Sequence, residues 1–165
     1  MRSTLAPLLL ATLLCGFGPA AFCADTALAF QGLRAGAGKP VEITADQLQV
    51  NQKDGNATFS GHVLVVQGEM RLATDELVVS YVAGDKSKID TLNANGHVLL
   101  ATPTEAAESE TGVYSLTSGQ LVLSGNVLLN QADSTISGQK LTVDLNTGVG
   151  HMDGRVKTVL QPAGN

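Results

Sequence analysis

The chain has 165 residues, with 10 basic and 15 acidic side chains and a formal net charge of −5. An acidic chain without a basic cluster is a poor candidate for binding nucleic acid. Aromatic residues make up only 4% of the chain and Trp is absent, while Val, Leu, Thr and Ser are abundant. This composition favours half-buried strands over a helical core.

The first 24 residues predict a secretory signal peptide. Arg2 is their one charged residue, and the apolar run 5–14 is followed by Gly16, Gly18 and Pro19. These helix breakers interrupt the run well before the ~20 apolar residues that a membrane span needs, so a retained anchor is the weaker alternative. Small residues at the recognition positions place the cleavage between residues 23 and 29.

Both cysteines, Cys15 and Cys23, lie within this leader. The mature chain is therefore expected to have no disulfide, no thiol nucleophile and no cysteine metal site. Removal of Arg2 also takes the net charge from −5 to −6. Residues 25–39, which include Gly36-Ala37-Gly38, predict a flexible lead-in, residues 40–160 a single domain, and residues 161–165 a frayed tail.

Two short signatures recur along the domain. The glycines of the first are separated by 35, 29 and 29 residues (96 − 61, 125 − 96 and 154 − 125). It reads Ser60-Gly61-His62-Val63, Asn95-Gly96-His97-Val98, Ser124-Gly125-Asn126-Val127 and Asp153-Gly154-Arg155-Val156. The second precedes each of these, as Ala45-Asp46-Gln47-Leu48, Thr74-Asp75-Glu76-Leu77, the looser Glu110-Thr111-Gly112-Val113, and Gly138-Gln139-Lys140-Leu141. The chain is thus four copies of one unit, which predicts stacked repeats that share a core.

Apolar and polar residues alternate within each unit, as expected of strands with one dry face. The apolar parity changes across Asp46 and again across Asp75, which predicts an extra residue there and a bend that keeps the apolar face inward. We therefore expect an all-β fold, a single antiparallel β-jellyroll of two facing sheets, with an open hydrophobic groove between them. The acidic stretch 103–110 has no such alternation and is expected to form an exposed loop.

The candidates for chemistry each have a simpler structural interpretation. His62 and His97 occupy the same place in successive units, but two histidines fall short of the usual zinc ligand set, and solvent-facing repeat positions explain them better. Asp46 and Asp75 fit corner hydrogen bonding better than acid–base catalysis, because neither has a nucleophile or a basic residue beside it. The run 144–148 faintly resembles a calcium loop but lacks the distal Glu, and a hairpin turn explains it. The sequence therefore predicts neither enzyme activity nor a metal or cofactor.

The expected interior is made of Val, Leu, Ile and Ala with few large aromatic residues. Sheets that face each other lie ~10 Å apart, and bulky side chains normally fill that gap. Small and medium side chains leave two possibilities open, an ordinary sandwich core and an interior that a guest molecule fills.

Five stretches carry a resemblance to a known family. The runs 40–46, 57–68 and 72–79, with Ser124-Gly125-Asn126-Val127 and Lys140-Leu141-Thr142-Val143 later in the chain, resemble the OstA-like family of lipopolysaccharide transport proteins. The resemblance covers about residues 40–160. It implies a twisted β-jellyroll open at both ends, located in the periplasm, whose interior binds the acyl chains of lipopolysaccharide, at its lipid A moiety. It also implies head-to-tail self-association into a bridge between an inner-membrane LptC-type protein and an outer-membrane LptD-type protein.

The expected lipid-binding residues come from two sources. The resemblance implies Val41, Ile43, Tyr114 and Leu116, and the alternation adds Phe59, Val63, Val65, Leu72, Val98, Leu100, Leu121, Leu123, Val127 and Leu129. Two alternatives remain at this point. One is an LptC-like module tethered by an uncleaved leader, and the other is a structural repeat protein of the envelope that binds no lipid.

Overall fold

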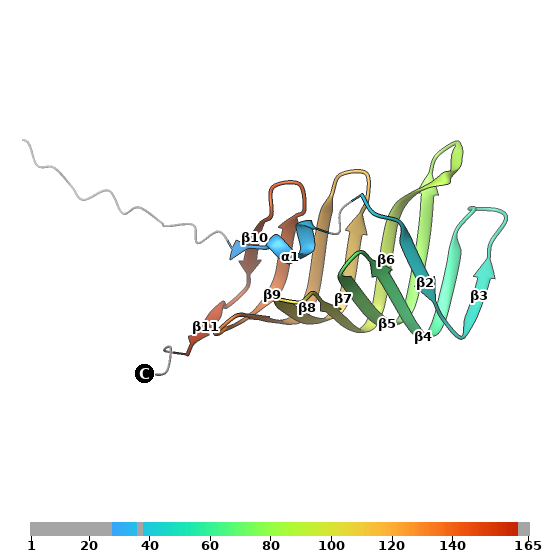
Figure 1. The fold of residues 1–165 in the computed structure, drawn as a ribbon. Coiled ribbons are helices and arrows are strands. Elements are labelled where there is room, and N and C mark those ends of the chain that lie inside the picture. Colours follow the sequence, from blue (N-terminus) through green and yellow to red (C-terminus); the bar gives the residue numbers. More distant parts are fainter. Residues whose placement is uncertain (1–27, 36–37, 162–165) are drawn as a thin grey trace, which may run out of the picture.

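The fold is known from a computed structural model that describes residues 28–35 and 38–161 (Figure 1). The predicted signal peptide 1–24 and residues 162–165 of the predicted tail lie outside the described residues. The strands are β1 (Leu28–Ala29), β2 (Val41–Thr44), β3 (Gln47–Val50), β4 (Ala57–Gln67), β5 (Met70–Val82), β6 (Asp85–Ala101), β7 (Glu105–Ser115), β8 (Gln120–Gln131), β9 (Ser134–Asp144), β10 (Val149–Asp153) and β11 (Lys157–Leu160). A short helix, α1 (Gln31–Arg34), follows β1.

The strands form one antiparallel sheet in which chain neighbours pair. Its order is β1-β10-β9-β8-β7-β6-β5-β4-β2, with β3 also on β4 and β11 also on β9. Tight turns join consecutive strands, and in the turn between β9 and β10 Asp144 accepts hydrogen bonds from the backbone N–H groups of Asn146 and Thr147. The all-β, jellyroll-like fold and the hairpin at 144–148 are thereby confirmed.

The long strands bend where the repeated signatures meet. At each corner one strand carries the Gly signature (the glycine strand) and its neighbour carries the second signature (the Asp strand). On the glycine strand β4, Gly61 and His62 face the single residue Asp75 of the Asp strand β5, and the register shifts there. Gly61 has φ 77° and His62 has φ 45°. The corner is therefore where the sequence predicted it, but the extra residue belongs to the glycine strand rather than to the Asp strand. Glycine tolerates this left-handed conformation, which explains its recurrence.

The bend folds the sheet into two arms that face each other across the core (Figure 1). At the vertex the inward residue just before each acidic or amide residue is small: Ala45, Thr74, Ser109 and Gly138. Thr74 is buried, and its hydroxyl donates to the backbone carbonyls of Asn95 and Gly96. Small side chains let the two arms meet closely at this line.

Two sequence expectations differ from the structure. The stretch 103–110 is not a loop, because β7 begins at Glu105 and continues through the corner. Its inward residues are polar or small, namely Glu105, Ala107 and Ser109, so hydrophobic alternation did not reveal the strand. The predicted lead-in 25–39 contains β1 and α1, and two of its side chains are buried, Phe30 between these elements and Leu33 in α1.

Candidate binding groove

The fourteen residues expected to line the interior all lie in one apolar cluster between the arms. Val41, Ile43, Phe59 and Leu116 are partly buried and pack against it. The other ten are buried: Val63, Val65, Leu72, Val98, Leu100, Tyr114, Leu121, Leu123, Val127 and Leu129. The structure thus brings together all the residues that the sequence analysis selected, which come from β2, from β4 to β8 and from the turn after β7, where Leu116 lies.

The selection omitted other inward residues. Those of the same strands are Ala57, Met70, Leu77, Val79, Leu92, Ala94 and Ala107, and β9 adds Ile136, Leu141 and Val143. Most of them follow the period of two and could have been found by extending each alternation to the strand end. Phe30 and Leu33 carried no such signal, because they precede the first repeat.

The middle of the interior is closed in this structure. Leu72 of one arm and Leu77, Leu92, Tyr114 and Leu121 of the other line a narrow apolar cavity with only about 10 Å³ of room for water. That is at the lower limit for a single water molecule. The arms therefore pack on each other here, and a guest would have to separate them.

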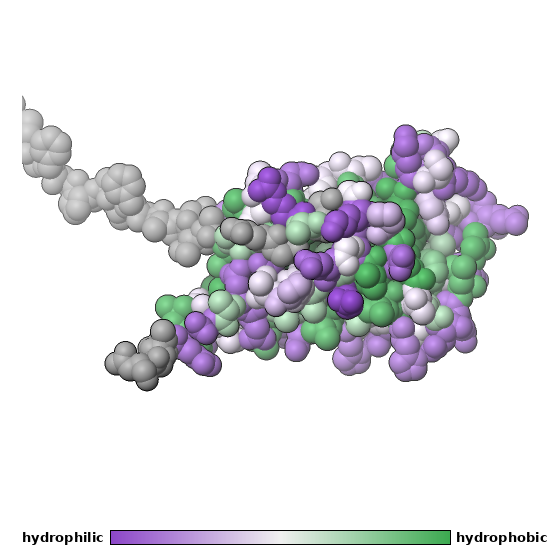
Figure 2. Space-filling view, viewed as in Figure 1, coloured by the Kyte–Doolittle hydropathy of each residue, from purple (hydrophilic) through white to green (hydrophobic). Residues whose placement is uncertain are grey.

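At the β3 end the apolar inner surface reaches solvent. Leu48 is 58% exposed and Val50 is 61% exposed, although Leu48 pairs with the inward-facing Phe59. Their exposure follows from position, since among the described strands β3 pairs only with β4. Figure 2 shows apolar residues gathered on this side of the molecule in the region of β2, with mainly hydrophilic residues around them.

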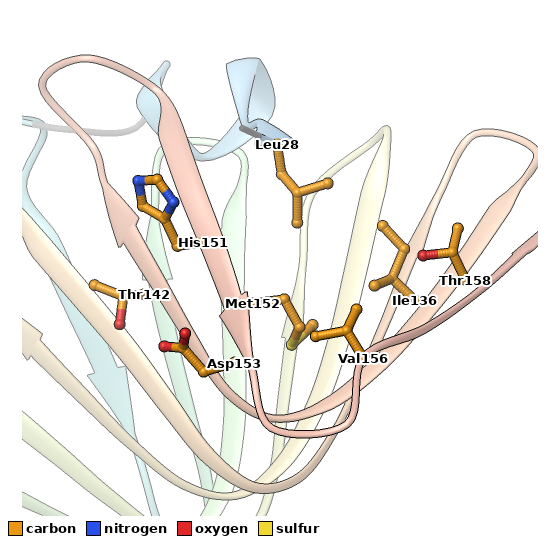
Figure 3. A pocket seen from close by; sticks show the side chains of 8 residues that line it. All are labelled: Leu28, Ile136, Thr142, His151, Met152, Asp153, Val156 and Thr158. Carbon is orange, nitrogen blue, oxygen red and sulfur yellow. The ribbon is translucent and has the colours of Figure 1, made fainter. Parts of the chain in front are cut away.

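At the opposite end lies a larger cavity of about 650 Å³. Figure 3 shows Met152 and Val156 close together on the two sides of the turn between β10 and β11, with Ile136 beside them and Leu28 above. His151 and Asp153 lie to one side. This end is therefore wide and partly polar, whereas the middle of the groove is narrow and apolar.

Buried polar groups mark the rim of one arm. Gln67 is 2% exposed, and its amide donates to the carbonyl of Lys39. Glu105, 7% exposed, accepts a hydrogen bond from the amide of Gln131. Burial raises the pKa of the Tyr114 hydroxyl, with a smaller opposing effect from the Gln67 side chain. This hydroxyl is therefore neutral at physiological pH and presents no charge to an apolar guest.

A row of polar contacts follows the outside of the vertex, and we call it the corner ladder. His62 Nδ1 lies 2.7 Å from Asp46 Oδ2, and His97 Nδ1 lies 2.7 Å from Asp75 Oδ2. Asn126 donates to Glu110 in the same position of the third unit, at 2.6 Å. The hydrogen bond that each imidazole donates to the neighbouring Asp carboxylate, and then the charge of that carboxylate, raise the pKa of His62 and of His97.

The ladder is a structural feature with no metal-site geometry. Both imidazoles are more than nine-tenths exposed, and each has one carboxylate partner. Among residues 28–35 and 38–161, no three His, Cys, Asp or Glu side chains come close enough together to hold a metal ion. In the same part of the chain, no helix is long and apolar enough to cross a membrane.

Comparisons with known proteins assign the chain to a family. The family model described as "LptA/(LptD N-terminal domain) LPS transport protein" matches residues 42–149. The chain belongs to this family. The OstA-like resemblance that the sequence suggested is thus confirmed.

Individual relatives agree with this assignment. An uncharacterized protein of Rhizobium meliloti (strain 1021) is 32% identical over 153 residues, which are 87% of this chain and 82% of that protein. The lipopolysaccharide export system protein LptA of Escherichia coli (strain K12) is 31% identical over 111 residues. That match spans 63% of this chain and 59% of the length of the E. coli protein.

A solved structure has the same fold. LptH of Pseudomonas aeruginosa, described as the LptA homologous periplasmic component of the lipopolysaccharide transport device, superimposes with a TM-score of 0.69. The likeness covers 77% of this chain and 99% of LptH at 19% sequence identity. The family proteins are named for transport rather than for catalysis, in line with the absence of a catalytic motif in the sequence.

Proposed function

We propose that this protein binds lipopolysaccharide in the periplasm and conducts it between the two membranes along its apolar interior. The observation that supports this most is the continuity of the apolar inner face, from the exposed Leu48 at one end to Met152 and Val156 at the other. Each methylene group moved from water to such a surface contributes ~0.8 kcal/mol. Several acyl chains are therefore held without covalent chemistry or a deep pocket.

The same proposal includes head-to-tail self-association, for which the sheet register gives a reason. One row of paired residues crosses the whole sheet beside the corner ladder: Gln47, Ser60, Glu76, Asn95, Thr111, Ser124, Lys140 and Asp153. The row begins at the free edge of β3 and stops at Asp153. A second copy that adds its β2 and β3 beyond β10 and β11 continues it by pairing its Gln47 with Asp153.

This register also keeps the apolar face continuous between copies. It places Leu48 of the second copy beside Met152 and Ala45 beside Val156, all on the inner side. Because the two ends of the molecule differ, the contact is heterologous and can repeat along a filament. The family resemblance implies an LptC-type and an LptD-type partner. We expect the LptC-type protein to bind one end of such a stack at the inner membrane and the LptD-type protein to bind the other end at the outer membrane.

Photo-crosslinking tests the lipid site. A crosslinker at Ile43 or Leu116, both partly buried against the interior cluster, should capture lipopolysaccharide in cells. A crosslinker at Leu64, which is apolar but 38% exposed and faces the other way from its neighbours Val63 and Val65, is the matched control and should not. Equal capture at Leu64 would contradict an interior lipid path.

The closed middle of the interior favours a second candidate, a structural repeat protein of the envelope with a filled core. It predicts no capture of lipid at any of the three positions and no binding of lipopolysaccharide by the purified protein. The tethered LptC-like alternative depends on the leader, outside the described residues, and is tested by sequencing the amino terminus of the protein isolated from cells.

A further inference from the structure

The segment 28–35, which we call the strap, lies on the mouth of the groove near its C-terminal end. The backbone N–H of Phe30 donates to the carbonyl of Gly148 on one arm, and the carbonyl of Ala29 accepts from the amide of Gln131 on the other. Phe30 is fully buried and Leu33 is 3% exposed. The strap therefore joins the two arms, and its two apolar side chains are buried between them.

The walls beneath the strap are shaped for these side chains. A Cβ atom added to Gly150 would lie 2.2 Å from Cε2 of Phe30, so the ring rests directly on the glycine backbone. Ala106, Ala107, Leu100 and Leu129 line the other side, and Leu141 lies on the same arm as Gly150. In the middle of the groove large side chains from both arms meet, whereas here glycine and alanine leave space that only the strap fills.

The strap is held by few interactions outside its apolar contacts. Its strand β1 has two residues, paired as Leu28 with Gly150 and Ala29 with Val149. Its helix has a single turn of 4 residues, too short to be stable on its own. Loss of the contacts of Phe30 and Leu33 would therefore release the whole segment without breaking any other strand pair.

We propose that the space under the strap is an acyl-chain subsite, which Phe30 and Leu33 occupy until lipid displaces them. An acyl chain supplies the same apolar contact to Gly150, Ala107, Leu129 and Leu141 that the strap supplies in the free protein. The strap also covers the edge of β10 at Gly150, where the register above places Val50 of a second copy. Lipid entry into this subsite and pairing of a second copy at Gly150 thus both require the strap to leave. This inference rests on the proposed lipid-binding function.

Locking the strap tests the subsite. Because the Phe30–Gly148 pair is hydrogen-bonded, the neighbouring pair Ala29 and Val149 is the non-hydrogen-bonded type, whose Cα atoms lie ~4.5 Å apart and suit a disulfide. The Ala29→Cys/Val149→Cys protein is exported, purified and checked by mass for both cysteines, and its binding to purified lipopolysaccharide is measured oxidised and reduced. We expect at least tenfold weaker binding for the oxidised form, with recovery on reduction. Phe30→Ala should bind at least threefold more tightly than the wild type.

Amide hydrogen exchange of the wild-type protein gives an independent readout. Addition of lipopolysaccharide should deprotect the Phe30 amide, while amides in the centre of β6 and β7 stay protected. If lipopolysaccharide binds but the Phe30 amide stays protected, or if the oxidised and reduced forms bind equally, the subsite is wrong and the proposed function stands. If no form binds lipopolysaccharide, the proposed function fails and the subsite with it.

Discussion

At the scale of single residues, the glycines beside the corner ladder, such as Gly96, are favoured for two reasons, a left-handed backbone conformation and a lack of space for a Cβ atom. Gly96 has φ 81° and would place a Cβ atom 2.4 Å from Oδ2 of Asp75, whereas Gly84 has φ 83° and meets no atom within 4 Å. The backbone cost of a left-handed conformation is therefore common to both positions, and the steric cost belongs to Gly96 alone.

Alanine at the two glycines should separate these costs. Gly84→Ala is expected to lower the free energy of unfolding by ~1 kcal/mol, the usual penalty of the left-handed region. Gly96→Ala should lower it by about two to three times as much, because Asp75 must also move. Urea denaturation measures both. Adding Asp75→Ala to Gly96→Ala should recover part of the loss, and equal effects at the two glycines would contradict the close contact.

The histidines of the ladder carry a testable pH dependence. Their pKa values are raised by Asp46 and Asp75, so each pair stabilises the folded state below the unfolded-state pKa and loses that effect as pH rises through the folded-state pKa. Asp46→Asn should lower the pKa of His62 and leave that of His97 unchanged. Asp75→Asn should lower that of His97 strongly and that of His62 slightly, since Asp75 also contributes there. Titration of the imidazole resonances by NMR measures each shift, and unchanged values in both variants would show that the pairs do not form in solution.

At the scale of elements, the free edge of β11 decides whether copies can join. Gln161 N–H donates to the carbonyl of Asp133, and Val159 pairs with Thr135 two residues earlier. By the alternation of antiparallel pairs, the N–H of Val159 faces β9 and the N–H of Leu160 faces away from the sheet. Proline at 159 would thus damage the fold, whereas proline at 160 removes only an outward donor.

Leu160→Pro should therefore reduce concentration-dependent oligomers while the monomer keeps its thermal stability. Leu160→Ala is the matched control, because it removes the same apolar side chain, 71% exposed in the monomer, and keeps the N–H group. Light scattering after size-exclusion chromatography over a range of concentrations measures the assembly. A wild-type protein that is monomeric throughout, or an equal loss in both variants, would contradict strand addition at this edge.

The elements also show how far hydrophobic patterns reach. Alternation and repeated glycines identified the strands of the repeat and its corners, because in those strands the inward positions are apolar and the turns need special backbone angles. Hydrophobic alternation did not identify β7. In this strand Glu105 is buried and accepts a hydrogen bond from Gln131, and Ser109 donates to the carbonyl of Thr111 at the vertex. Alternation also failed for the strap, since Phe30 is buried by contact with the distant Gly150 and no local period marks it.

At the scale of the whole molecule, the repeat explains both the shape and the open ends. Each unit buries its apolar face only against a neighbour, so the first and last units are each left with one uncovered side. At one end the uncovered strands are β2 and β3, and at the other they are β11 and most of β10, with β1 on the remainder. A second copy can cover either end, because its β2 and β3 can pair with β10 and β11 of the first copy and have a corner at the same place.

The register of that contact is a sharp prediction. Phe30 N–H donates to Gly148 O, so the carbonyl of Gly148 points to the outer edge of β10. Because backbone groups alternate in direction along a strand, those of Met152 also point to this edge, and Asp153 is at a non-hydrogen-bonded position for any strand added there. Gln47 pairs with Ser60 on the far side of β3, and the row that crosses the sheet places it opposite Asp153 of the preceding copy. The two residues lie at opposite ends of one molecule, so a disulfide between them forms only between copies.

Mixing an Asp153→Cys protein with a Gln47→Cys protein under mild oxidation should therefore give a disulfide-linked heterodimer. Non-reducing electrophoresis with differently tagged proteins measures its rate. Gln49→Cys is the matched control, because it lies on the same outward face two residues out of register. Its rate of disulfide formation should be at least several times lower. A pair in register brings the sulfur atoms within bonding distance, and the diagonal pair does not. Equal rates would show a contact without fixed register. Faster linkage at Gln49 would show that the corner does not continue from one copy to the next, and that the apolar faces of adjacent copies are not aligned for a lipid chain to pass.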